Sequence, residues 1–204
     1  NTIGSLVARC LPLLVLIAGL APSPGARAQS YQLSPAWSLA PKDGEFPDIG
    51  HLTRGLAYNP TTGHLLVVSR VVSPAVHILD GDTGAELGTL PFDGAVIVGG
   101  TFAINMIGIT DDGVIYVGNL TTDAKDPAAT KGPFRLYRWA DETAQPELVY
   151  FGDPSEEDPV ANNRRFGDSL ALRGTGAGTQ ILLGTLDKNV ALLTTADGTY
   201  FSAT

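Results

Sequence analysis

The chain has 204 residues, 44% of them hydrophobic, and contains 24 Gly and 14 Pro. This composition is that of a globular domain. With 21 acidic against 13 basic residues, the net charge is −8, and this balance argues against a nucleic-acid partner, which requires a basic stripe to meet the phosphates.

Residues 1–28 have the features of a signal peptide. Arg9 supplies a positive charge, residues 11–21 form an apolar run, and Ala26-Arg27-Ala28 is a small-x-small cleavage site. The apolar run is short of the about 20 residues that a membrane-spanning helix needs. We therefore predict a secreted or periplasmic protein with no transmembrane span in its mature chain. The alternative is an N-terminal helix packed on the domain.

Cleavage after Ala28 changes the charge and the redox chemistry of the chain. It removes two arginines, no acidic residue and the only cysteine, Cys10, so the net charge goes from −8 to −10. An exported protein without disulfides needs a core that is large enough to hold it together.

Residues 29–204 contain strands and turns without helical periodicity. Residues 37–39 are strand-like, and such a segment completes the last blade of a closed propeller. Three repeats of about 50 residues follow, as in propeller blades, at about residues 52–90, 103–151 and 164–204. Their predicted strands are residues 55–58, 64–68, 75–79 and 86–90, then 106–109, 114–117, 134–139 and 147–151, then 169–172, 180–183, 189–193 and 199–201.

The first repeat resembles those of secreted bacterial β-propellers. The resemblance lies in residues 54–65 (RGLAYNPTTGHL) and in residues 78–87 (ILDGDTGAEL). The group includes NHL-type, quinoprotein-like, lactonase-like and surface-layer-type propellers. Residues 162–168 and 193–198 are similar to one subfamily, exported propellers of unknown function. The resemblance implies an all-β fold, a partial ring of three blades, and it says little about activity because propellers have many functions.

One group of polar residues is a candidate site. If Leu56, Ile107 and Leu170 are equivalent positions of the innermost strands, then Arg54, Asn105 and Asp168 lie at one level, with Arg165 close by. Together these four residues could bind an anionic or sugar ligand through charge-assisted hydrogen bonds. Two alternatives stay open. Asp168 and Asn105 could help to hold a divalent ion such as Ca²⁺, as in lactonase-like propellers, or the polar side chains could tie neighbouring blades together.

The other motifs give weaker indications of a functional site. The sequence has no standard catalytic signature, so we assign no catalytic residue and no metal ligand. Residues 80–84 (DGDTG) imitate the start of a calcium loop, but they are also what a tight turn requires. We interpret His51, His64 and His77 as solvent-facing or hydrogen-bonded. Alternation places Tyr137 and Trp139 on one strand face, which is typical of a core between blades.

These observations predict an exported, non-catalytic propeller that serves as a binding or scaffolding module at the cell envelope or outside the cell. Its partner would be a protein or a glycan at the cell surface. The alternative is a metal-dependent hydrolase, lactonase-like or glycan-processing, with its site on the channel axis.

We expect the natural protein to continue beyond Thr204, because three blades alone leave an apolar blade face and strand edges unprotected. If the chain ends there, the product 29–204 should be poorly stable or should associate through the open face. Thermal melting and analytical ultracentrifugation of this product measure both properties. A compact monomer that melts cooperatively would contradict the expectation.

Overall fold

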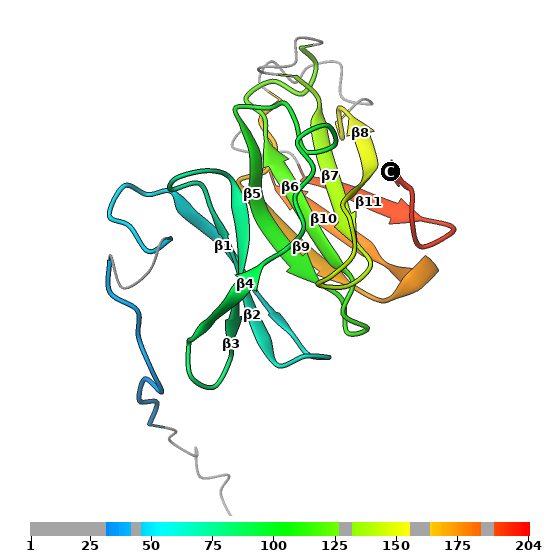
Figure 1. The fold of residues 1–204 in the computed structure, drawn as a ribbon. Helices are drawn as coiled ribbons and strands as arrows, with labels where there is room; N and C mark the ends of the chain where they lie inside the picture. The colour runs from blue at the N-terminus through cyan, green and yellow to red at the C-terminus, as the bar shows by residue number, and fades with distance from the viewer. Residues whose placement is uncertain (1–31, 42–45, 127–131, 156–163, 185–189) are drawn as a thin grey trace, which may run out of the picture. The chain divides into compact units, whose positions relative to one another are not determined.

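The computed structural model describes residues 32–41, 46–126, 132–155, 164–184 and 190–204 (Figure 1). The predicted signal peptide, residues 1–28, lies outside these ranges. Contacts divide the chain into two units, Asn1–Ser34 and Pro35–Thr204, and the second unit contains every described strand. No helix long and apolar enough to cross a membrane occurs among the described residues.

The described residues form three four-stranded antiparallel sheets and no α-helix. In each sheet, strands that follow one another in the chain are hydrogen-bonded neighbours. The first sheet consists of β1 (Thr53–Asn59), β2 (His64–Ser69), β3 (Ala75–Asp80) and β4 (Glu86–Thr89); the second of β5 (Phe102–Ile109), β6 (Ile115–Leu120), β7 (Phe134–Trp139) and β8 (Glu147–Gly152); the third of β9 (Ser169–Arg173), β10 (Gln180–Gly184), β11 (Val190–Thr195) and β12 (Phe201–Ala203). The predicted all-β class is thereby confirmed, and every predicted strand of the three repeats overlaps an observed one.

The first and second sheets pack through one apolar core. Alternate residues of β2 and β3, among them Leu66 and Ile78, share this core with the buried rings of Tyr137 and Trp139 on β7. The Tyr137 hydroxyl donates to the Val98 carbonyl oxygen at 2.7 Å, and Trp139 Nε1 donates to that of Pro91 at 2.9 Å. Burial raises the pKa of Tyr137 to about 12. These two rings therefore form core between sheets, as their alternation predicted.

A second core joins the second and third sheets. Tyr116, Phe134 and Leu136 contribute from the second sheet, and Ile181 and Leu193 from the third. Every residue of β6 is buried, because the second sheet has a neighbour on each face. The apolar side chains on one face of β6 thus belong to the first core, and those on its other face belong to the second.

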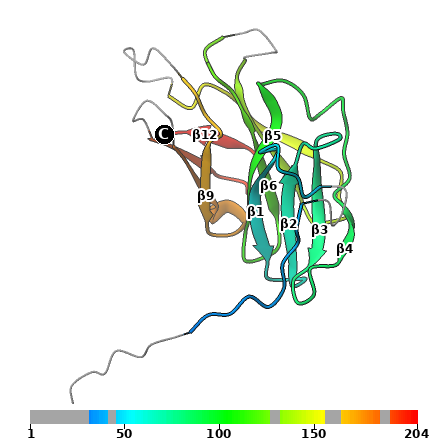
Figure 2. The same cartoon turned by 90° about the vertical axis from the view of Figure 1, so that its left-hand side faces the viewer.

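The first strands of the three sheets contact one another, β1 with β5 and β5 with β9 (Figure 2). A glycine lies at each contact. At Gly55 of β1, an added Cβ would stand 2.7 Å from the Ile107 backbone nitrogen of β5. At Gly108 of β5, an added Cβ would stand 2.5 Å from Leu172 Cδ2 of β9. These strands can approach so closely only because glycine has no side chain at these two positions.

The outer faces of the first and third sheets differ. Residues 37–39 are not a strand, which corrects the sequence-based prediction. Trp37 instead packs on the outer face of the first sheet with Phe46, its Nε1 donates to the Gly81 carbonyl at 3.0 Å, and its ring lies against Gly84. On the outer face of the third sheet, Leu182 is exposed and lines an open, largely apolar depression with Ala171, Leu172 and Leu192.

Replacement of Gly55 by Ala should destabilise the fold by about 1–3 kcal/mol, the usual cost of overpacking. The new methyl group meets backbone atoms of β5, which a side-chain rotation cannot move away. Gly94→Ala is the matched control, because Gly94 is exposed and an added Cβ there meets nothing within 4 Å. Its effect should be below about 0.5 kcal/mol. Urea unfolding measures both, and equal effects of the two substitutions would contradict the role of Gly55.

Candidate functional site

Both β1 and β5 are irregular where they begin. Between Thr53 and Leu56, β1 advances three residues while its partner β2 advances two, from Ser69 to Val67. Between Phe102 and Met106, β5 advances four residues while β6 advances two. The shift in β1 has the one extra residue of a β-bulge, and the shift in β5 has two extra residues. Such irregularities change the direction of side chains and are common beside binding sites.

These irregular segments contain two of the four residues that the sequence analysis selected, Arg54 and Asn105. The other two, Arg165 and Asp168, directly precede β9. The structure therefore places Arg54 at the start of β1, Asn105 within β5, and Arg165 and Asp168 just before β9. With Arg70 and Phe102 they form what we call the first-strand cluster: Arg54, Arg70, Phe102, Asn105, Arg165 and Asp168.

Asn105 connects the three sheets within this cluster. Its Oδ1 accepts a hydrogen bond from Arg70 Nη1 at 3.1 Å, and its Nδ2 donates to the Gly167 carbonyl oxygen at 2.7 Å. The residue is 3% exposed. Buried amides are stable when both ends are hydrogen-bonded, so the observed bonds match the sequence-based alternative in which such residues tie neighbouring sheets together.

Asp168 is engaged with a cation of the chain itself. Arg165 Nη2 donates to Asp168 Oδ1 at 2.7 Å, and Arg165 Nε donates to Oδ2. The hydrogen bond to Asp168 raises the pKa of Arg165. The side chains are 32% and 40% exposed, so this bidentate pair lies at the surface. Both carboxylate oxygens of Asp168 are held by one guanidinium group.

Arg54 and Arg70 have unused hydrogen-bond donors. Arg54 is exposed, and its side chain forms no hydrogen bond or ion pair with any described residue. Arg70 stacks on Phe102, with its Cζ 3.5 Å from the ring centroid. Its Nε is buried without a hydrogen-bond partner. Burial and, to a smaller extent, the charge of Arg54 lower the pKa of Arg70. The Arg70 amide donates to the Leu52 carbonyl oxygen at 3.1 Å, two residues before Arg54 in the chain, so the backbone brings the two arginines to the same end of the first sheet.

Arg70 and Phe102 were missed by the sequence analysis, although a signal for Arg70 exists. Arg70 directly follows β2, and antiparallel pairing places the end of β2 beside the start of β1, where Arg54 lies.

The side chains of Asp168 and Asp80, at positions that the sequence analysis considered for metal binding, are engaged with groups of the chain itself. No group of three His, Cys, Asp or Glu side chains that could hold a metal ion is present in the described part of the chain. In the DGDTG segment, Asp80 Oδ1 accepts hydrogen bonds from the Asp82 and Thr83 amides at 3.1 and 2.8 Å. This geometry is an Asx turn, so the structural interpretation of that segment is confirmed.

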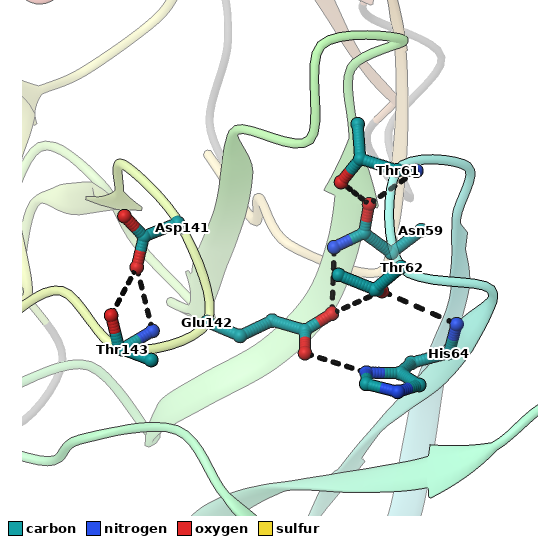
Figure 3. A network of polar contacts seen from close by, with 7 residues as sticks. All are labelled: Asn59, Thr61, Thr62, His64, Asp141, Glu142 and Thr143. Carbon is teal, nitrogen blue, oxygen red and sulfur yellow. Dashed lines mark hydrogen bonds and ion pairs between the residues drawn. The ribbon is translucent and has the colours of Figure 1, made fainter.

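A second polar cluster joins the first and second sheets at the other end of β1 (Figure 3). Glu142, in the β7–β8 connection, accepts hydrogen bonds through Oε1 from Asn59 Nδ2 and Thr62 Oγ1, both at 2.7 Å. Its Oε2 lies 2.7 Å from His64 Nδ1. His77 likewise contacts Glu86 at 2.7 Å. The interpretation of these two histidines as hydrogen-bonded residues is confirmed.

The fold is similar to that of a known protein. The crystal structure of a DUF4623 family protein from Bacteroides eggerthii matches with a TM-score of 0.56 and 23% sequence identity, over 74% of this chain and 33% of that one. The chain thus spans about a third of the length of the protein it matches. No family model and no curated protein sequence matches the chain. The similarity concerns the fold, and the name of that family denotes a domain of unknown function.

Removal of the Glu142 carboxylate should weaken the junction between the first two sheets. Glu142→Ala leaves the buried amide of Asn59 without its acceptor, which costs about 1–3 kcal/mol. Glu147→Ala is the matched control, since Glu147 is 58% exposed and forms a surface pair with Arg138. Such a pair is worth about 0–1 kcal/mol. Chemical denaturation compares the two variants, and a Glu142→Ala effect no larger than that of Glu147→Ala would refute the role of Glu142.

Proposed function

We propose that the chain is part of an exported β-propeller that binds a partner and does not catalyse a reaction. In a propeller, four-stranded antiparallel sheets pack face to face around a central channel. The three sheets here follow one another in the chain, pack through two successive cores, and contact one another through their first strands. In this proposal residues 52–90, 103–151 and 164–204 are blades, and the first-strand cluster lies at one mouth of the channel.

The observation that supports the binding function is which polar groups of the first-strand cluster already have hydrogen-bond partners within the chain and which do not. The amide of Asn105 and the carboxylate of Asp168 are the two oxygen ligands that the hydrolase alternative requires. Asn105 Oδ1 accepts from Arg70, and Asp168 accepts twice from Arg165. The unused groups are N–H donors of arginines. This distribution favours recognition of a ligand over the coordination of a divalent cation, which the nearby guanidinium charges repel.

Export and location are supported by the sequence. In residues 1–28 a positive charge, an apolar run and a small-x-small site follow one another as in a signal peptide. The acidic net charge suits a protein that stays dispersed outside the cell. We therefore place the protein at the cell envelope or outside it, with a protein or glycan of the cell surface as its partner.

A binding panel with the full chain separates the two functions. Protein treated with EDTA is applied to immobilised neutral and acidic cell-surface glycans and to intact envelope fragments, and chromatography shows whether the ligand is altered. We expect metal-free protein and the Asp168→Ala variant to bind, and the ligand to be recovered intact. Metal-dependent cleavage that Asp168→Ala abolishes would establish the hydrolase instead. A folded protein that binds no member of the panel would contradict the proposal.

A further inference from the structure

The first-strand cluster concentrates positive charge in an acidic chain. It contains Arg54, Arg70 and Arg165 against the single carboxylate of Asp168, which Arg165 already neutralises. The acidic residue nearest in sequence before β1, Asp48, accepts a hydrogen bond from the Ile49 amide and forms no ion pair with Arg54. A net charge of two thus remains on Arg54 and Arg70, while the whole chain carries −8.

Arg70 is held in place before any ligand binds. Its guanidinium stacks on the Phe102 ring and donates to Asn105 Oδ1. Asn105 is in turn fixed by its bond to the Gly167 carbonyl. A stacked and hydrogen-bonded arginine loses little side-chain entropy when it binds a ligand, so its remaining donors contribute more to affinity.

Arg54 adds a second, exposed donor at the same end of the first sheet. The bulge at residues 54–55 interrupts the regular pairing of β1 with β2 at this side chain, and the Arg54 side chain forms no hydrogen bond or ion pair with the described residues. Two neighbouring guanidinium groups repel each other, and this repulsion is relieved when an anion lies between them.

We infer that the partner of the proposed binding module carries an oxyanion, a carboxylate or a phosphate, and that Arg54 and Arg70 together bind it. This inference rests on the proposed function and specifies its ligand chemistry. Guanidinium groups match both oxyanions by parallel N–H···O bonds. In a polymer that bears many such groups, for example an acidic surface polysaccharide, one oxyanion would bind to Arg54 and Arg70.

Titration calorimetry with the full chain tests the inference directly. The probes are an oligogalacturonate for the carboxylate, tripolyphosphate for the phosphate, and maltohexaose as the neutral oligosaccharide. We expect one or both anionic probes to bind and maltohexaose not to bind, with affinity that falls at high ionic strength. Binding of the oligogalacturonate alone identifies a carboxylate ligand, and binding of tripolyphosphate alone identifies a phosphate ligand.

Three variants connect the binding to the cluster. Arg54→Gln should weaken the anionic probe about tenfold or more, the loss expected for one charge-assisted hydrogen-bonded contact. Arg70→Lys keeps the charge and should also weaken binding, because lysine lacks the planar guanidinium group that stacks on Phe102 and donates two parallel hydrogen bonds. Arg173→Gln is the control: Arg173 is exposed at the opposite end of β9, where it donates to Gln180, and its replacement removes the same charge. That control should bind the probe as the parent chain does.

The outcomes are distinguishable from those of the panel experiment. Equal losses for Arg54→Gln and Arg173→Gln would show that only overall charge matters and would overturn the inference. Preference for neutral glycans on the panel, with Arg54→Gln unaffected, would also overturn it while the binding function stands. Absence of binding in both experiments, with the melting curve of the chain intact, would overturn the proposed function as well.

Discussion

The close approach of the first strands is the constraint on which the rest of the structure depends. β1 reaches β5 at Gly55, and β5 reaches β9 at Gly108, where side chains would collide with backbone and leucine atoms. With the strands this near, the sheets present their broad faces to each other and bury the two apolar cores. Apolar burial supplies most of the stabilisation of such a fold, and the two glycines determine where it takes place.

The strands were predictable from the sequence because their signal is local. Alternation of apolar and polar residues shows which side of a strand is buried, and it correctly placed Tyr137 and Trp139 in a core between sheets. Turn residues showed where each strand ends. The local pattern failed at Trp37, because its apolar character indicated a strand while its indole N–H found the Gly81 carbonyl, 44 residues away.

The site was only half predictable, for the same reason. Alignment of the repeats selected Arg54, Asn105 and Asp168, which the structure places at the start of β1, within β5 and directly before β9. It did not reveal how each polar group is used, because the partners come from other sheets: Arg70 is 35 residues from Asn105, and Glu142 is 83 residues from Asn59. The irregular pairings at the starts of β1 and β5 also lack a sequence signature that marks them in advance.

Stability and ligand binding are coupled through Asn105. Its side-chain Nδ2 donates to the Gly167 carbonyl oxygen before the third sheet, and its Oδ1 accepts from Arg70 of the first sheet. The hydrogen bond to Arg70 therefore both joins two sheets and orients a donor of the proposed anion site. Ordering Arg70 during folding moves the entropic cost from the binding step to the folding step. By linkage, an anion bound between Arg54 and Arg70 favours the arrangement in which β1, β5 and the Gly167 segment are joined. A ligand of this cluster therefore stabilises the contact between first strands from which the two cores extend.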